Sequence, residues 1–171
     1  VEGKEDSMSG QDEKAKAYEH WLLQAAGTGS RGFLRFLRKE RSARQIYEEV
    51  QAGRLKESLP EQYQKKAEKL ERFYPDYDIE GEYKRLSQRG IKLVVEGEEE
   101  YPDRLQKIPD PPYGLYYAGK LPDKEKKAVA VIGARDCSEY GRYMAKRFSA
   151  ALAQADIDVI SGMARGIDGI S

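Results

Sequence analysis

The chain has 171 residues, enough for one or two domains of ordinary size. It is 35% charged and 39% hydrophobic, but twelve Tyr, four Phe and one Trp exclude a wholly disordered chain. Thirty Lys and Arg balance thirty Asp and Glu, so the net charge of zero gives no whole-chain attraction to nucleic acid or to an anionic membrane. Any such attraction must come from a local segment.

The composition also argues against membrane and metal chemistry. The longest uncharged runs, such as 128–134, are about a third of the ~20 residues that a membrane span needs. One Cys and one His do not suffice for an internal disulfide or a zinc cluster. We therefore expect a cytoplasmic protein without membrane contact, metal site or cofactor.

The first half of the chain has a helical pattern. Apolar residues recur at helical spacing between about residues 14 and 89, which predicts four or five short helices. Ser42 is expected to cap the third helix, and Ser58 with Glu61 forms a capping-box pattern. We assign residues 1–12 to a disordered tail and residues 13–75 to a small helical domain.

After Gly90 the pattern changes to short β-type runs at 91–95, 115–119, 128–132 and 157–161. A helix-length segment between the last two runs, 139–155, completes a βαβ unit, and its apolar face is approximated by Tyr143, Phe148, Ala151, Leu152 and Ala155. The run 128–132 is continuously apolar, as expected for a strand covered by helices on both sides of a parallel sheet. The predicted fold class is α/β.

Two loops leave the carboxyl ends of the predicted parallel strands, at 133–141 and 161–171. At this edge of an α/β sheet, loop N–H groups and helix N-termini face a crevice that suits an anion. The residues expected to bind phosphate there are Gly133, Arg135, Ser138, Ser161, Gly162, Arg165 and Gly166. The alternative is that the glycines are turn residues and both arginines are solvated. Neither loop has the dinucleotide or Walker A pattern, so the ligand need not be a nucleotide cofactor.

Residues 101–168 carry a series of motifs in a fixed order: 101-YP-102, 108-IPDPPYGLYYAG-119, 129-VAVIGAR-135 and 161-SGMARGID-168. This series resembles the DNA processing protein A family, also called Smf. The resemblance implies that residues 76–171 begin a Rossmann-like domain and form the first part of a truncated parallel sheet. It also implies binding of single-stranded DNA, protection of incoming strands and loading of a RecA-type recombinase in natural transformation, by a homodimer when the chain is full length.

The family resemblance extends to individual loop residues. Gly133 and Arg135 fall on the family's G-[ST]-R motif, with Ala134 where Ser or Thr is commoner. Arg135 is therefore the residue most readily expected to contact a DNA phosphate. A carboxylate repels phosphate, so Asp168 is expected to orient neighbouring N–H or arginine groups. The resemblance implies no catalytic residue.

The segment 22–40 resembles a helix-hairpin-helix, within a domain of that or SAM-like type. A G-x-G hairpin precedes a basic amphipathic helix, and the surrounding basic residues are Arg31, Arg35, Arg38, Lys39, Arg41 and Arg44. Backbone N–H groups of such a hairpin can hold phosphate without reading bases, so Gly27, Gly29, Arg31 and Arg35 form a predicted secondary DNA contact. Two alternatives are a solvated basic face and a platform for a protein partner.

An enzyme of the nucleoside-monophosphate phosphoribohydrolase type is the alternative function, because it places phosphate in a similar crevice. Its Gly-rich P-G-G-x-G-T-type loop and catalytic Glu do not occur before Ser171. His20 has no nucleophile or carboxylate that can be placed beside it from sequence, and Cys137 is interpreted as inert. The acidic run at 96–100 is interpreted as a solvated loop.

Overall fold

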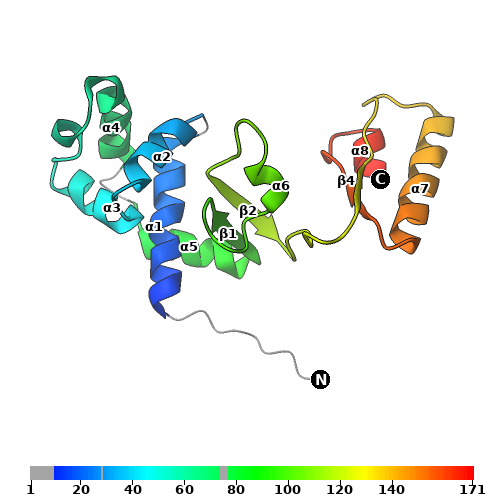
Figure 1. Cartoon of the computed structure of the whole chain (residues 1–171), viewed down its shortest axis with the longest axis horizontal. Coiled ribbons are helices and arrows are strands. Elements are labelled where there is room, and N and C mark those ends of the chain that lie inside the picture. The colour runs from blue at the N-terminus through cyan, green and yellow to red at the C-terminus, as the bar shows by residue number, and fades with distance from the viewer. Residues whose placement is uncertain (1–9, 28, 74–76) are drawn as a thin grey trace. The chain divides into compact units, whose positions relative to one another are not determined.

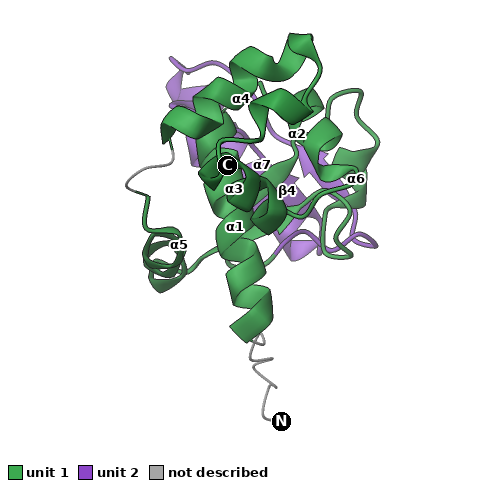
Figure 2. Ribbon diagram, turned by 90° about the vertical axis from the view of Figure 1, so that its left-hand side faces the viewer, with its two compact units in different colours: residues 1–120 green, residues 121–171 purple. Residues whose placement is uncertain are grey.

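The computed structural model describes residues 10–27, 29–73 and 77–171. The chain separates into two compact units, unit 1 over residues 1–120 and unit 2 over residues 121–171 (Figures 1 and 2). Among the described residues, no helix combines the length and apolar character needed to cross a membrane.

Unit 1 is built around a long central helix, α1 (Gly10–Ala26), which contacts α3, α4 and α5 (Figure 1). The buried face of α1 includes Trp21, Leu22 and Ala25, each fully inaccessible to solvent, as the helical periodicity predicts. The shorter helical elements that follow are α2 (Arg31–Arg38), α3 (Ala43–Gln51), η1 (Lys56–Ser58), α4 (Glu61–Phe73) and α5 (Ile79–Gln88).

The two predicted capping residues have different outcomes. Ser42 forms a full capping box with Gln45: its side chain accepts from Gln45 N, and the Gln45 side chain accepts from Ser42 N. The prediction for Ser58 is wrong, because Ser58 ends η1 and its Oγ donates to Leu55 O at 2.8 Å. Since Pro60 comes immediately before α4, Ser58 lies two residues too early to be its N-cap.

Unit 1 also contains an antiparallel pair of strands, β1 (Ile91–Val95) and β2 (Gly114–Ala118), with a short helix, α6 (Asp103–Gln106), between them. The register pairs Leu93 with Tyr116. Leu93 and Val95 are buried in the same core as the helices, and α5 packs on α1. The strands and α5 therefore complete the helical core.

The boundary between the compact units lies at residues 120–121, whereas the sequence placed a domain boundary at residues 75–76. A change from helical to strand periodicity does not by itself mark the end of a core, because strands and helices can bury one shared apolar surface. Residues 10–12, assigned to a tail, form the first turn of α1, where Asp12 and Glu13 suit the positive end of the helix dipole. Residues 1–9 lie outside the described part of the chain.

A buried ionic network joins α1, α2 and the start of β2. Arg38 lies 2.7 Å from Glu19 Oε1 and donates from Nε to the Tyr113 hydroxyl at 2.8 Å, and that hydroxyl donates to Glu19 Oε2 at 3.0 Å. Glu19 and Tyr113 are each 6% exposed. Burial raises the pKa of the Glu19 carboxyl, and the Arg38 guanidinium opposes that rise.

Unit 1 holds His20 in an aromatic environment. Its Nδ1 lies 2.8 Å from the Tyr116 hydroxyl, and the rings of Tyr77, Tyr83 and Tyr116 surround it at centroid distances of 6.4, 6.1 and 5.6 Å. Burial lowers the pKa of His20 below its usual value, partly opposed by the nearby Glu82 carboxylate. The folded chain therefore favours the neutral imidazole.

Unit 2 contains the predicted βαβ arrangement. Strands β3 (Ala128–Ala130) and β4 (Asp158–Ile160) are parallel, and α7 (Glu139–Gln154) connects them. Lys126 ties the beginnings of the two strands together, with Nζ 2.8 Å from Asp156 and 2.9 Å from Asp158. A short helix, α8 (Ile167–Ile170), follows the loop after β4 and contacts α7.

The predicted apolar face of α7 is wrong at its large residues. Tyr143 and Phe148 are 55% and 59% exposed, while Ala145 and Ser149 are the buried positions. Helix α7 contacts β4 and α8, and strands of three residues offer too little surface to bury large rings. The continuous burial expected for 128–132 is not found either, because Val129 and Ile132 are exposed.

Loss of the Arg38 side chain is expected to destabilise unit 1. Arg38→Met leaves the buried Glu19 carboxylate without its cation, so we expect a loss of about 3 kcal/mol in the free energy of unfolding. Urea denaturation followed by the fluorescence of Trp21, the only Trp in the chain, measures it. Arg44→Met, which breaks the exposed pair with Glu48, is the control. Equal stability of the two variants would contradict the role of the network.

The lowered pKa of His20 predicts a pH-dependent stability. In the unfolded chain His20 binds a proton at its ordinary pKa, whereas in the folded chain it does so only at lower pH. Protonation therefore favours the unfolded chain, and the free energy of unfolding falls as pH drops from about 7.5 to about 5.5. His20→Gln is expected to flatten this slope, measured by the same fluorescence experiment. Glu19, whose pKa is raised, acts in the opposite direction at lower pH. A slope unchanged in His20→Gln would show that His20 is not its source.

Candidate functional site

The loops after β3 and β4 meet at the carboxyl edge of the parallel strands. Ile167 N donates to Ala134 O at 3.2 Å, and Gly133 N donates to Asp168 Oδ1 at 3.1 Å. Asp168 thus orients a backbone N–H of the other loop, as the sequence predicts. The two hydrogen bonds fix the loops against each other inside unit 2.

Glycines allow this close approach of the loops. Gly166 has φ +94°, and a Cβ there would overlap Ala134 O and lie 2.5 Å from Arg135 O. A Cβ at Gly133 would lie 2.7 Å from Ile167 Cγ1. The structure therefore gives both glycines a role in loop-to-loop packing, and the Gly133 N–H is already donated to Asp168. Gly162 is similarly enclosed, since a Cβ there would lie 2.9 Å from Asp168 Oδ2.

The two predicted serines make internal hydrogen bonds. Ser138 is the N-cap of α7 and accepts from Gly141 N at 3.1 Å. Ser161 Oγ lies 2.9 Å from Val131 O and 3.1 Å from Asp168 O, so its hydroxyl proton is directed to a backbone carbonyl. Ser138 still has a hydroxyl proton to donate at the N-terminus of α7, whereas Ser161 serves to hold its loop.

The two predicted arginines differ in their surroundings. Arg165 forms an ion pair with Asp136 at 2.6 Å, with both side chains more than 70% exposed, so the pair is weak and screened by salt. Arg135 is exposed, and among the residues that the structure describes it has no carboxylate partner. Arg135 precedes the 16-residue helix α7, whose N-terminus carries the positive end of the helix dipole. This edge of unit 2 therefore presents a guanidinium and a helix N-terminus to solvent.

The helical hairpin of unit 1 has the predicted glycines in the left-handed conformation, Gly27 at φ +72° and Gly29 at +78°. The carbonyl of Ala26 accepts from Ser30 Oγ at 2.8 Å and from Lys69 Nζ at 2.9 Å. Thr28 lies outside the described residues. A cleft of about 520 Å³ lies between this hairpin and residues 110–114 of the same unit.

Five of the six basic residues beside the hairpin, all but Lys39, form internal ion pairs. Arg31 contacts Asp110 and lies 4.0 Å from Glu96, and Arg35 donates from Nε to the same Glu96 at 2.5 Å. Three further ion pairs are Arg38–Glu19, Arg41–Glu49 and Arg44–Glu48. The expected basic patch therefore carries much less net charge than its sequence indicates. Glu96, interpreted from sequence as part of a solvated loop, is a partner of both hairpin arginines.

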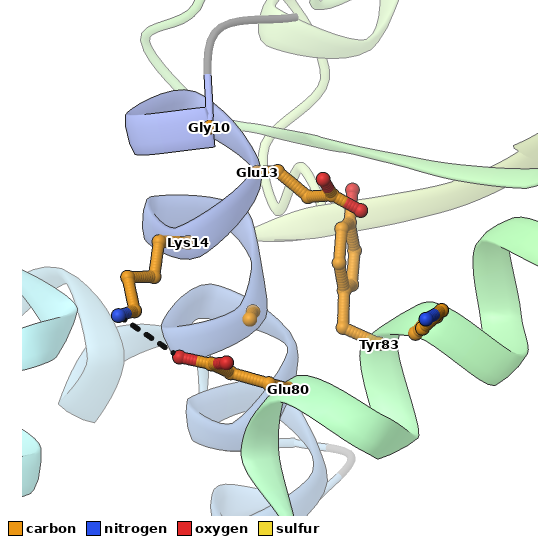
Figure 3. Close-up of a pocket in the computed structure, with 7 residues that line it drawn as sticks. Gly10, Glu13, Lys14, Glu80 and Tyr83 are labelled. Atoms are coloured by element: carbon orange, nitrogen blue, oxygen red, sulfur yellow. Dashed lines mark ion pairs between the residues drawn. The ribbon is translucent and has the colours of Figure 1, made fainter.

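Another cleft, of about 340 Å³, lies between α1 and α5 and is shown in Figure 3. Lys14 and Glu80 form an ion pair of 3.1 Å beside it, and Glu13 lies near the Tyr83 hydroxyl in the figure. Acidic and basic side chains are mixed along this cleft, so it has no convergent positive charge for a phosphate.

Comparison with known proteins identifies relatives of the second half of the chain. A family model described as DNA recombination-mediator protein A matches residues 92–171. The chain is 36% identical over 90 residues to Protein Smf of Borreliella burgdorferi, covering 53% of this chain and 29% of that protein. It is 34% identical over 98 residues to Protein Smf of Escherichia coli, covering 57% of this chain and 26% of that protein.

A third relative is DNA processing protein DprA of Bacillus subtilis, 28% identical over 104 residues, or 60% of this chain and 34% of that protein. The aligned part thus spans between about a quarter and a third of the length of these relatives. The matched family region contains β1 from its second residue onward, β2 and all of unit 2. It includes each of the seven loop residues expected to bind phosphate.

Substitution of Gly166 tests the loop packing. Gly166→Ala places a Cβ against the Ala134 carbonyl at a positive φ, so we expect unit 2 to lose about 3 kcal/mol of stability. Hydrogen–deuterium exchange of β3, β4 and α7 is expected to accelerate. Gly141→Ala is the control, since a Cβ there would have its nearest neighbour, Ser138 Oγ, at 3.4 Å and would lie in a helix. Exchange in Gly166→Ala that matches Gly141→Ala would refute the packing role.

Proposed function

Because residues 92–171 belong to the DNA recombination-mediator protein A family, we propose that this chain binds single-stranded DNA through its sugar-phosphate backbone. The observation that carries the proposal is the position of Arg135. This exposed guanidinium lies in a loop fixed by the Gly133–Asp168 hydrogen bond, four residues before the first residue of α7. A charged donor in a loop that leads into a helix N-terminus is a favourable site for a phosphate.

The neighbouring residues have further roles within the proposed site. Ser138 offers a hydroxyl proton at the same helix end, and Arg165 can exchange its exposed pair with Asp136 for a DNA phosphate. Gly133, Ser161, Gly162 and Gly166 support the site by holding the two loops. Contacts of this kind recognise phosphate groups and do not read base sequence.

The proposal extends to a role in DNA processing for recombination. A protein that holds strands by their backbone, without breaking a bond, can protect incoming DNA and help to load a RecA-type recombinase onto it. In this proposal the chain is a binding protein without a catalytic residue or cofactor, in a Rossmann-like domain that forms a homodimer in the full-length protein. The relatives named Smf and DNA processing protein DprA support this direction.

The helical hairpin has a smaller place in the proposal. For Gly27, Gly29, Arg31 and Arg35 to bind DNA, the ion pairs with Glu96 and Asp110 must open. We therefore assign the main DNA contact to the Arg135 loop, and the hairpin contact is a secondary one that exchanges internal carboxylates for phosphates.

Anisotropy titration of a labelled oligo-dT at several salt concentrations tests the main site. Arg135→Ala is expected to weaken binding about tenfold or more for every sequence tested, because one charged hydrogen bond is lost. The slope of log affinity against log salt is expected to decrease by about 0.7. Both effects follow from a single phosphate contact.

Arg147→Ala is the matched control, since Arg147 lies on α7 and donates to the Tyr143 hydroxyl at 3.0 Å. It removes the same charge from the same unit, away from the loops. If Arg135→Ala binds no more weakly than Arg147→Ala, or changes sequence preference at constant affinity, the proposed phosphate contact is wrong.

A further inference from the structure

Unit 1 contains a cleft of about 460 Å³ that the proposed loop site does not use. It is lined by His20 and Gln24 of α1, by Glu82, Arg85 and Leu86 of α5, and by the flanking residues Tyr77 and Arg89. Its volume is within the range of small-ligand sites. The lining has an aromatic part and a charged part.

The aromatic part is formed by Tyr77 and His20. Tyr77 is half-buried, lines the cleft and packs on Phe73 with ring centroids 5.1 Å apart. His20 is only 6% exposed, and its Nδ1 is engaged with the Tyr116 hydroxyl. A flat ring at the wall of a cleft offers a surface on which a nucleobase can stack, whatever its identity.

Polar groups inside the cleft can contact the edge of a base. Gln24 lines the cleft and donates from Nε2 to the Tyr116 hydroxyl at 3.3 Å, leaving its carbonyl oxygen as an acceptor. Burial lowers the pKa of His20, which favours the uncharged imidazole, and because Nδ1 is engaged with the Tyr116 hydroxyl only Nε2 is left to donate or accept. These groups suit a neutral heterocycle.

The charged part supplies a phosphate partner. Arg85 pairs with Glu82 at 2.5 Å, which neutralises the only carboxylate of the lining. Arg89 is exposed and, within the part of the chain that the structure describes, has no ion-pair partner. An unpaired guanidinium at the margin of an aromatic cleft is the arrangement that recognises a base and its phosphate together.

We propose that this cleft binds one nucleotide, with the base against Tyr77 and the phosphate at Arg89. The ligand class is a nucleoside monophosphate unit, taken from a single strand or free in solution. The inference rests on the proposed function only in naming a nucleic acid as the natural source of that unit. It adds a second binding site, on the helical unit, to the site at the Arg135 loop.

Proton NMR of the 171-residue chain tests this site through His20. The chain has a single His, so the Cε1–H resonance of the imidazole is identified without labelling. Titration with dTMP is expected to shift this resonance to saturation, while thymidine and inorganic phosphate each bind at least about tenfold more weakly. A short oligonucleotide, (dT)4, distinguishes the sources: tighter binding than dTMP identifies a strand, and equal binding a free nucleotide.

Variants of the two contact residues complete the test. Arg89→Ala is expected to weaken dTMP binding about tenfold or more, and Tyr77→Leu about fivefold or more. Lys84→Ala removes an exposed cation of α5 outside the cleft, and Tyr77→Phe keeps the ring; both are expected to bind dTMP as the unmodified chain does. Tyr77→Phe also controls for loss of packing against Phe73.

The proposal is overturned if dTMP produces no shift, if phosphate or thymidine alone matches dTMP, or if Arg89→Ala behaves as Lys84→Ala does. Arg135→Ala separates this result from the loop site, because it is expected to leave the His20 shift intact. Loss of oligo-dT binding in the anisotropy experiment and loss of the His20 shift are therefore independent failures.

Discussion

Unit 1 depends on the burial of one carboxylate. Glu19 is 6% exposed on the central helix, and an unpaired charge there would destabilise the fold by several kcal/mol. Arg38 of α2 and the Tyr113 hydroxyl satisfy both of its oxygens. These contacts fix the short helix α2 and the start of β2 to α1. The network thereby decides which segments share the core, and explains why the strands belong with the helices.

The same constraint changes the meaning of the basic residues. Arg31, Arg35 and Arg38 are close together in sequence, but carboxylates distant in the chain neutralise them in the folded unit. Clustered charge in a sequence therefore overstates the field at the surface. Arg135 and Arg89 are different, because each is exposed and has no ion-pair partner in the described structure. Phosphate recognition is better assigned to such residues than to the most basic segment.

Local patterns predict local structure well in this chain. The segment 139–155 is found as α7 over Glu139–Gln154, and Ser42 forms its predicted capping box. Contacts between distant residues have no such signal: the Tyr113 and Glu19 partners are 94 residues apart, and His20 and Tyr116 are 96 apart. The prediction of the buried face of α7 was wrong for a related reason. Periodicity identifies apolar stripes, but the small size of the sheet decides which stripe is buried.

The loop glycines show that residues singled out by their spacing can have another physical role. The spacing indicates Gly133 and Gly166 as phosphate-binding residues. A Cβ at either position would collide with the neighbouring loop, so glycine is needed there for the two loops to pack together. Asp168 accepts the hydrogen bond of the Gly133 N–H and places a negative charge beside that amide. In the proposed binding mode, the phosphate contact therefore falls to Arg135 and not to the Gly133 N–H. The packed loops fix the backbone on both sides of Arg135, but its side chain is exposed, so the cost of ordering the backbone is met in folding and that of the side chain in binding.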